Sequence, residues 1–250
     1  MSKFSLKDKV AIITGASKGI GEAMASIYAA AGAKVVVSSR KQEAVDAVAE
    51  KITEAGFEAI GVACNTGDMD EIGNLVDKTL EAYGKIDIVV NNAATNPVFG
   101  PVIQTNTEAF DKIMDVNVKG PFELVKLCVP HLKAGGSIIN ISSVGGISPE
   151  AHLGIYSVSK AALISLTKVL AKELGPQGIR ANVICPGLIK TKFSEALWSN
   201  DDLTKKFVKH LPLQRIGESD EITGLALFLA SEASSYCTGG VYTADGGFTI

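Results

Sequence analysis

The chain has 250 residues, 46% of them hydrophobic, so it can fill one sizeable core or at most two small ones. Lysine and arginine number 24 and aspartate and glutamate 27, which gives a formal net charge of −3. Because nucleic acids are bound by clustered cations and the sequence has no such cluster, we expect no nucleic-acid partner. No apolar run approaches the roughly 20 residues of a spanning helix, and residues 1–10 lack the apolar core of a secretory signal, so no membrane partner is expected.

The cysteines and histidines argue against a disulfide framework and against a metal centre. The four cysteines, at positions 64, 128, 185 and 237, are far apart and form no C-x-x-C pair. Three of them lie in apolar surroundings, which is typical of reduced, buried thiols. The three histidines, at 131, 152 and 210, do not have the spacing of metal ligands, so we expect no metal site.

Short β-branched segments alternate with longer helical ones from Val10 onward. The predicted strands span 10–14, 34–38, 58–64, 86–90, 137–142, 180–184 and 241–244, and the predicted helices span 19–31, 42–55, 69–83, 107–132, 156–174 and 218–230. The strands are mostly continuous apolar runs, as expected for a parallel sheet covered on both faces. This alternation predicts an α/β protein: one Rossmann-type, doubly wound domain over residues 1–250, with about seven parallel strands and helices on both faces.

Four glycines follow predicted helices directly, at positions 32, 56, 84 and 175. A left-handed residue is favoured just past the end of a helix, and glycine adopts that conformation without strain. We therefore expect all four to end their helices in this way.

Residues 191–214 interrupt the alternation. They follow a Pro-Gly turn at 186–187 and include Phe193, Leu197, Trp198 and Phe207 among polar residues. Insertions after the carboxyl end of a strand lie where such sheets bind ligands. We predict a lid over a substrate site, around residues 188–214; the alternative is a helical excursion that covers the core.

A glycine-rich turn joins the first predicted strand to the first predicted helix. It reads Thr14-Gly15-Ala16-Ser17-Lys18-Gly19-Ile20-Gly21, with the spacing G-x-x-x-G-x-G. Glycines let the backbone approach a phosphate, and a helix N-terminus adds free N–H groups and a positive dipole. The turn therefore predicts a dinucleotide site that includes Gly15, Ser17, Lys18, Gly19, Ile20 and Gly21. A tight turn of purely structural value is the alternative.

The end of the second predicted strand indicates which dinucleotide binds. A carboxylate there would bind the ribose 2′-hydroxyl and repel a 2′-phosphate, but the strand ends Ser38-Ser39-Arg40-Lys41. Arg40 can pair with a phosphate, Lys18 can reach the same place, and the two serine hydroxyls can donate to it. NADP is therefore the predicted cofactor. A solvated surface arginine is the alternative interpretation of Arg40.

Tyr156 and Lys160 are four residues apart, hence on one face of a predicted helix, and Ser143 follows the fifth predicted strand. A tyrosine hydroxyl titrates near pH ~10 and is a poor base at neutral pH. A neighbouring ammonium favours the phenolate, so we expect Lys160 to lower the pKa of Tyr156. Tyr–Lys pairs at this spacing also occur on ordinary amphipathic helices, but the combination with a glycine turn and a strand-ending serine is far less common.

Together these motifs resemble the short-chain dehydrogenase/reductase family over nearly the whole chain. The matching residues are T-G-x-x-x-G-I-G at 14–21, Asn91-Asn92-Ala93-Ala94, Asn117, Ser143, Tyr156-x-x-x-Lys160 and Pro186-Gly187. Two positions depart from the family pattern: Ala94 replaces the usual glycine, and Asn65 replaces the aspartate that usually contacts adenine. An amide can still bond adenine, since it offers both donor and acceptor.

The resemblance implies a role for each matching residue. Tyr156 would be the acid/base, Ser143 would polarise the substrate oxygen, and Lys160 would lower the pKa of Tyr156 and bind the nicotinamide ribose. Asn117 would distort its helix and hold a water in a proton relay through Lys160. The implied cofactor contacts beyond the glycine turn are Ser39, Arg40, Asn65, Asn91, Ala93, Tyr156, Lys160, Pro186, Gly187, Ile189 and Thr191.

Residues 92–97 and 186–194, with Leu197-Trp198, look most like the NADP-dependent retinal and carbonyl reductases of animal peroxisomes. Those proteins end in a peroxisomal tripeptide, whereas this chain ends Phe248-Thr249-Ile250, so we expect a cytoplasmic protein. The family also implies a homotetramer, built through the helices at 107–132 and 156–174 and the C-terminal segment. Apolar residues on those helices would equally suit the core of a monomer.

The expected reaction is reversible reduction of a carbonyl, ketone or aldehyde, to an alcohol with NADPH. The candidate substrate residues are Asn96, Phe99, Ser148, His152, Leu188, Phe193, Leu197 and Trp198, whose aromatic and aliphatic groups suit a hydrophobic small molecule. Two alternatives remain: a 3-oxoacyl reductase that acts on acyl-carrier-protein or CoA thioesters, which cations such as Lys190 and Lys192 would favour, and a non-catalytic NADP(H)-binding protein. The intact serine, tyrosine, lysine and asparagine argue against the latter.

Overall fold

The computed structural model describes residues 3–199, 204–205 and 208–250. In these residues one parallel sheet of seven strands has the order β3-β2-β1-β4-β5-β6-β7. The strands are β1 (Val10–Thr14), β2 (Lys34–Ser39), β3 (Ala59–Ala63), β4 (Ile88–Asn91), β5 (Ser137–Ile141), β6 (Arg180–Pro186) and β7 (Val241–Ala244). The order reverses between β1 and β4, which is the switch point where such sheets bind ligands. The predicted doubly wound α/β fold is confirmed.

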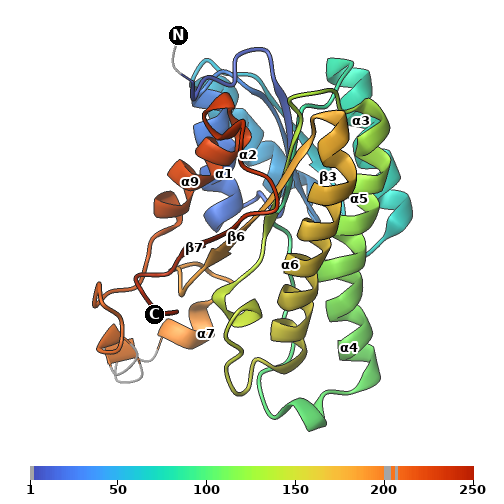
Figure 1. Cartoon of the computed structure of the whole chain (residues 1–250). Coiled ribbons are helices and arrows are strands. Elements are labelled where there is room, and N and C mark those ends of the chain that lie inside the picture. The colour runs from blue at the N-terminus through green and yellow to red at the C-terminus, as the bar shows by residue number, and fades with distance from the viewer. Residues whose placement is uncertain (1–2, 200–203, 206–207) are drawn as a thin grey trace.

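Helices cover both faces of the sheet (Figure 1). One face carries α1 (Gly19–Ala30), α2 (Gln42–Glu54) and α9 (Thr223–Ala230), and the other carries α3 (Met69–Tyr83), α5 (Gly120–Cys128) and α6 (Gly154–Leu174). Alternate residues of the strands face the two layers: in β1, Ala11 and Ile13 pack on the first and Ile12 on the second. Burial on both sides explains why the strands are continuous apolar runs.

Two short helices and several single turns complete the described elements. The helices are α4 (Thr107–Met114) and α7 (Glu195–Trp198), and α7 lies at the same end of the molecule as the C-terminus (Figure 1). The 3₁₀ turns are Val102–Gln104, Val129–His131, Val144–Gly146, Gly175–Gln177, Ser219–Ile222 and Glu232–Ser234.

The helix predicted at 107–132 is not continuous. It divides into α4, a π-helical turn at Asp115–Lys119, α5 and a 3₁₀ turn. Pro121 has no N–H to donate to the carbonyl of Asn117 four residues earlier, so the α-helical ladder cannot continue through this point. Gly120 is also required here, because a side chain would collide with the Thr66 carbonyl.

Three of the four predicted glycine caps are confirmed, and one is wrong. Gly32, Gly56 and Gly84 have φ of 98°, 87° and 72°. Gly175 has a right-handed φ of −53°, and the chain continues into a 3₁₀ turn before Gly178 supplies the left-handed residue at φ 74°. The helix predicted at 218–230 likewise begins with a 3₁₀ turn, so only its second part is α9.

One helix in the described part of the chain, Gly154–Gln177, is long and apolar enough to cross a membrane by length and composition alone. It includes α6, whose Leu163, Thr167 and Leu170 are buried in the fold. Core helices pass the same test, so the test is weak evidence for a membrane span.

Candidate active site

The glycine turn is shaped by its contact with the segment after β4. A Cβ on Gly15, whose φ is 64°, would lie 2.8 Å from the Ala93 Cα, and one on Gly21 would collide with the Gly15 carbonyl and the Asn92 amide. These two glycines are therefore required by packing alone. Gly19, with φ 61°, faces outward to Thr191, whose Cγ2 would be 3.2 Å from an added Cβ.

The N-terminus of α1 fits a phosphate group. Lys18 occupies the N-cap position, and no side chain caps the first turn. The first N–H groups of a helix need acceptors, and an anion at this end is also favoured by the helix dipole. Glycine backbone, open N–H groups and a cationic cap residue thus meet at one place beside β1 and β4.

The end of β2 offers cations and one accessible hydroxyl. Lys18 and Arg40 are exposed, and among the described residues no carboxylate forms an ion pair with either. The Ser17 hydroxyl donates to that of Ser39 (3.1 Å). Ser38 is fully buried, so the expectation that both strand-ending serines reach the cofactor is wrong for Ser38. Its side chain points to the sheet face on which Val36 packs, because side chains alternate along a strand, whereas that of Ser39 points to the other face.

Asn92 and Thr14 hold this turn against β4, and the motif analysis did not select them. The Thr14 hydroxyl donates to the Val90 carbonyl (3.2 Å) and accepts from the N–H groups of Asn92 and Ala93 (3.0 and 3.1 Å). The Asn92 amide donates to the carbonyls of Thr14 and Gly15 (2.9 and 3.1 Å). Their place within the T-G and N-N-A motifs was the available signal.

Two asparagines proposed for cofactor binding differ in accessibility. Asn91 is buried, and its amide donates to the Asn140 side chain on β5 (2.9 Å). Its side chain therefore joins β4 to β5 through one amide hydrogen. Asn65 is half-buried after β3, and its side-chain oxygen accepts from the Gly67 N–H (3.2 Å).

Ser143, Tyr156 and Lys160 come together at the carboxyl end of β5. Ser143 caps the 3₁₀ turn Val144–Gly146, where its hydroxyl oxygen accepts from the Gly145 N–H (3.1 Å) and also hydrogen-bonds Tyr156. Lys160 is 2% exposed; its Nζ donates to the Ile141 carbonyl (2.8 Å) and lies 5.5 Å from the Tyr156 ring centre. The hydroxyl groups of Ser143 and Tyr156 therefore lie close to the buried ammonium group of Lys160.

The expected lowering of the Tyr156 pKa by Lys160 is wrong for the protein without cofactor. Burial raises the pKa of Tyr156 to about 12, and the hydrogen bond with Ser143 opposes this only in part. Burial also lowers the pKa of Lys160 to about 8. The ammonium is directed to the Ile141 carbonyl, and desolvation dominates both groups. At neutral pH Tyr156 therefore carries its proton and can act as a donor.

Asn117 lies in the π turn and is fully buried. Its side-chain oxygen accepts from the Thr95 N–H (2.8 Å), and its amide donates to the Thr95 carbonyl (3.0 Å) and to the Ser159 hydroxyl (3.0 Å). Both amide hydrogens are therefore used within the protein. The acceptors left for a relay water at Asn117 are its backbone carbonyl, to which Pro121 cannot donate, and the second lone pair of its side-chain oxygen.

The Pro-Gly turn ends β6 and leads into the segment whose Thr191 lies beside Gly19 of the glycine turn. Gly187 must lack a side chain, since a Cβ would lie 2.7 Å from the Asp245 Cα, and its N–H donates to the Ala244 carbonyl (3.0 Å). Ile189 is buried and pairs with Gly217 in an isolated parallel bridge, flanked by Leu188.

The described part of the predicted lid is organised around Ser194. The Ser194 hydroxyl donates to the Ile189 carbonyl (2.5 Å) and shares a hydrogen bond with the Thr191 hydroxyl (3.0 Å), while the Trp198 indole donates to the Thr191 carbonyl (3.1 Å). The Phe193 ring lies 6.0 Å from the Tyr156 ring, centre to centre. The α7 helix is thereby held beside the reactive tyrosine. Residues 200–203 and 206–207, including Phe207, lie outside the described residues.

The other candidate substrate residues lie on the segments before α4 and α6. Phe99 and His152 stack with ring centres 5.9 Å apart, and the Gly100 N–H donates to the His152 carbonyl (3.0 Å). His152 has φ of 70°, which is unusual for a residue with a side chain. Ser148 is exposed and Asn96 half-buried; Leu197 is exposed on α7. Among the described residues, no hydrogen bond, ion pair or ring contact joins this group to Phe193 or Trp198.

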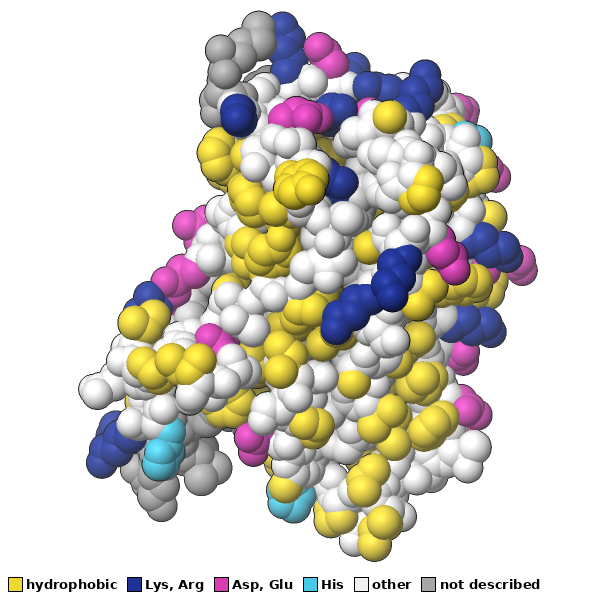
Figure 2. Space-filling view, viewed as in Figure 1, with side chains coloured by type: hydrophobic (Ala, Val, Ile, Leu, Met, Phe, Trp, Pro, Cys, Tyr) yellow, Lys and Arg dark blue, Asp and Glu magenta, His cyan; other side chains and the backbone are white. Residues whose placement is uncertain are grey.

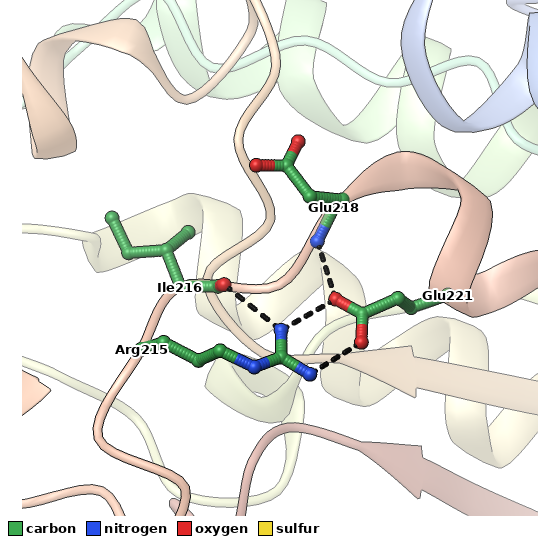
Figure 3. Close-up of polar contacts among 4 residues, drawn as sticks. All are labelled: Arg215, Ile216, Glu218 and Glu221. Carbon is green, nitrogen blue, oxygen red and sulfur yellow. Dashed lines mark hydrogen bonds and ion pairs between the residues drawn. The ribbon is translucent and has the colours of Figure 1, made fainter.

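An ion pair closes the base of the lid segment (Figure 3). The Arg215 guanidinium donates to both oxygens of Glu221 (2.7 and 2.5 Å), and Glu221 also accepts from the Glu218 N–H (2.8 Å). The hydrogen bonds from Arg215 lower the pKa of Glu221 to about 2. The sequence analysis missed this pair. With the Ile189–Gly217 bridge, it fixes where the segment leaves and rejoins the fold.

Known proteins share this architecture over nearly the whole chain. The family model described as enoyl-(acyl carrier protein) reductase matches residues 15–249. Dehydrogenase/reductase SDR family member 4 of Oryctolagus cuniculus is 42% identical over 244 residues, 97% of this chain and 94% of that protein. A short-chain type dehydrogenase/reductase from Mycobacterium marinum superposes with a TM-score of 0.91 at 38% identity, covering 99% and 98% of the two chains. A blue fluorescent protein from a metagenomic library, solved with NADPH, superposes with a TM-score of 0.92 at 30% identity, covering 98% and 100%.

Proposed function

The chain belongs to the short-chain dehydrogenase/reductase family of oxidoreductases, whose fold binds a nicotinamide cofactor, and we propose that it is an NADP(H)-dependent reductase of ketones or aldehydes. The observation that carries this proposal is the convergence of Ser143, Tyr156 and Lys160 at the carboxyl end of β5, on the same sheet edge as the glycine turn. The reaction is reversible, so the matching alcohols are substrates in the other direction.

The choice of NADP rests on charge. A 2′-phosphate at the end of β2 would find Arg40 and Lys18, neither of which forms an ion pair with any described carboxylate, and the linked hydroxyls of Ser17 and Ser39 beside them. The structural relative solved with NADPH agrees with this choice. The proposed cofactor contacts are those named from the sequence, and at Asn91 one amide hydrogen is already engaged by Asn140.

The nicotinamide, when bound, supplies or accepts the hydride. Tyr156 would donate its proton to the substrate oxygen, as its raised pKa at neutral pH allows. Ser143 accepts from the Gly145 N–H, and its own hydrogen, which serves the hydrogen bond with Tyr156 in this structure, would turn to the substrate oxygen and stabilise developing negative charge there. Lys160 would hold the ribose and, as an ammonium, favour the tyrosinate left after proton transfer. Asn117 would support a proton relay through its backbone carbonyl.

The proposed substrate is a hydrophobic carbonyl compound. Phe193 beside Tyr156, together with Leu188, Leu197 and Trp198, presents apolar surface next to the reactive hydroxyl. Asn96, Phe99, Ser148 and His152 would line the opposite side. The rabbit relative is named a dehydrogenase/reductase, which fits a reaction between a carbonyl and an alcohol but names no substrate.

Assembly as a homotetramer in the cytoplasm completes the proposal. Hydrophobic side chains gather over α4 to α6 on the right of the view in Figure 2. Phe110, Phe122, Val158 and Val169 are each at least 40% exposed on these helices. A shallow hollow of about 420 Å³ beside them is lined by Met114, Val118, Phe122 and Leu166, with Asp115 and Lys119 also in its lining. Contiguous exposed apolar surface of this kind marks protein interfaces.

The test is oxidation of NADPH, and separately NADH, followed at 340 nm against ketones, aldehydes, α-diketones and an acyl thioester. Turnover of hydrophobic carbonyls with NADPH is the expected result. Efficient turnover with NADH alone would overturn the cofactor choice. Binding of NADPH without turnover of any compound would overturn the proposed chemistry.

A second candidate is reduction of acyl thioesters on the same residues. The matching family model is described by an acyl-carrier-protein activity, and Lys190 and Lys192 are exposed where the lid leaves β6. Acyl carriers are acidic, so cations at the entrance would attract them. Lys190, however, lies over the Trp198 ring at 5.4 Å, which engages one of the two cations within the lid. Preference for the thioester in the same assay would favour this candidate.

A further inference from the structure

We propose that Ser159 is a positioning residue for the reaction, which ties the helix carrying Tyr156 and Lys160 to the loop after β4. This inference rests on the proposed reductase function and assigns it a residue that is itself not expected to touch substrate or cofactor. Ser159 is fully buried and immediately precedes Lys160 on α6.

A continuous set of hydrogen bonds passes through this hydroxyl. Ser159 Oγ donates to the Tyr156 carbonyl (2.7 Å) and accepts from Asn117 Nδ2 (3.0 Å). The same Asn117 side chain bonds both the N–H and the carbonyl of Thr95 (2.8 and 3.0 Å). The path therefore runs from the backbone of the reactive tyrosine to the backbone of the loop that contains Ala93 and Asn96.

The two ends of this path flank the reacting atoms. Tyr156 supplies the proton, and the loop at 93–96 carries one cofactor residue and one substrate residue of the proposed site. Small misplacements of reacting groups, of about 1 Å, can cost on the order of 100-fold in rate. Ser159 is the single side chain that connects Asn117 to α6 in these bonds, so its hydroxyl links the two walls directly.

The same helix contains a matched arrangement farther along. Thr167 Oγ1 donates to the Leu163 carbonyl (2.8 Å) and accepts from Asn140 Nδ2 (2.8 Å). Thr167 is also fully buried, and it lies seven residues beyond Lys160. Both hydroxyls thus bond a carbonyl of α6 and a buried asparagine amide, but only Ser159 bonds the carbonyl of Tyr156. Removal of either hydroxyl should perturb folding similarly, which makes Thr167 the control for a merely structural role.

The experiment compares Ser159→Ala, Ser159→Thr and Thr167→Val in the full-length enzyme, with NADPH and one hydrophobic ketone. We expect Ser159→Ala to lower kcat by roughly 10- to 100-fold, with KM for the ketone changed by less than about threefold. Ser159→Thr retains the hydroxyl and should restore kcat to within about threefold of the wild type, and Thr167→Val should leave it within the same range. The pH profile of kcat should shift in Ser159→Ala alone, because the relay at Asn117 is displaced.

Hydrogen exchange supplies a measurement that does not depend on turnover. The Thr95 amide donates to Asn117, so its exchange should accelerate at least fivefold in Ser159→Ala and stay unchanged in Thr167→Val. If Ser159→Ala does not fold, Ser159→Cys preserves most of the volume with a weak hydrogen-bonding group and should show both effects in smaller measure. Equal kcat and equal Thr95 exchange in the Ser159 and Thr167 variants would overturn the inference. Absence of wild-type turnover, with Thr95 still responding to Ser159, would instead overturn the reductase function.

Discussion

The glycine turn between β1 and α1 and the lid segment between β6 and α9 border the same site but are built differently. In the turn, Gly15 and Gly21 have no room for a side chain, and Asn92 and Thr14 hold the backbone through partly buried hydrogen bonds. In the lid, Phe193 and Leu197 are exposed, and the secured parts are its base and the hydroxyl of Ser194. The difference indicates that cofactor geometry is built into the core, whereas substrate selection depends on a surface segment that can change without disturbing it.

Loss of the Tyr156 hydroxyl should have the largest effect on activity, since the glycine turn and the lid segment both border the site in which it reacts. Tyr156→Phe should lower kcat on the order of 10²- to 10⁴-fold, the range typical of general acid catalysis, while NADPH binding stays intact. Steady-state kinetics and titration calorimetry measure the two quantities. Activity within a few fold of the wild type would contradict the role of Tyr156. It would also contradict the idea that the glycine turn and the lid segment border one common reactive group.

A methyl group in the glycine turn tests how tightly that region is packed. Gly21→Ala should lower the free energy of unfolding by about 1–3 kcal/mol, because the new Cβ overlaps the Gly15 carbonyl and the Asn92 amide. Gly73→Ala is the matched control: it lies within α3 with nothing near its added Cβ, and helix propensity should raise stability by about 1 kcal/mol. Urea unfolding that shows equal changes for the two variants would contradict the packing argument.

The charge at the end of β2 should decide between the two cofactors. Arg40→Ala removes the cation proposed to pair with the 2′-phosphate, so kcat/KM with NADPH should fall at least about tenfold while that with NADH changes little. Lys41→Ala, the neighbouring exposed cation, is the control. An equal fall in kcat/KM with NADPH and with NADH in Arg40→Ala would mean that Arg40 does not recognise the 2′-phosphate.

On the lid side, Phe193→Ala should affect selectivity more than chemistry. The ring next to Tyr156 offers apolar surface, so KM for a large hydrophobic ketone should rise roughly tenfold, and that for a small aldehyde much less. Phe57→Ala, a partly exposed phenylalanine in the connection between α2 and β3, should leave both KM values unchanged. Identical changes for both substrates would show that the lid does not discriminate between them.

The smallest effect is expected at the base of the lid. The lowered pKa of Glu221 means that its contribution to stability is present above pH ~4.5, its ordinary range, and is lost as pH falls toward 2. The difference in melting temperature between the wild type and Glu221→Gln should therefore be largest above pH 5 and shrink on acidification. Because the pair is exposed, high salt should also diminish it. A difference that is independent of pH would contradict the assignment.

Much of the fold followed from local pattern. The bounds of the seven strands were predicted within a few residues, because continuous β-branched runs bounded by glycines are typical of strands in a parallel sheet that is covered on both faces. The helix at 107–132 was predicted as continuous, since its apolar spacing continues through the π turn and only Pro121, one residue after Gly120, signals the change. Gly175 failed as a cap because Pro176 starts another turn there, which a rule based on the end of a periodic segment does not detect.

The site was predictable in its residue types but not in its electrostatics. Ser143, Tyr156 and Lys160 could be selected from spacing, but whether Lys160 or burial controls the pKa of Tyr156 depends on where the ammonium points and how much water is excluded. Ser159, Asn92 and the Arg215–Glu221 pair were missed for a similar reason. Asn92 and Ser159 bond partners that are distant in sequence, and Arg215 and Glu221 belong to no motif; Asn92 alone had a local signal, its place in the Asn91–Ala94 motif.

Local sequence patterns were thus sufficient for the parallel sheet, the glycine turn and the set of reactive side chains, because hydrophobic period and short-range backbone constraints act within a few residues. The burial of Lys160, the inward position of Ser38 and the bonds that join Asn117 to both Thr95 and Ser159 required the folded chain. Desolvation and buried hydrogen bonds depend on which distant segments surround a group. That information is present only once β4, the π turn and α6 have packed against one another.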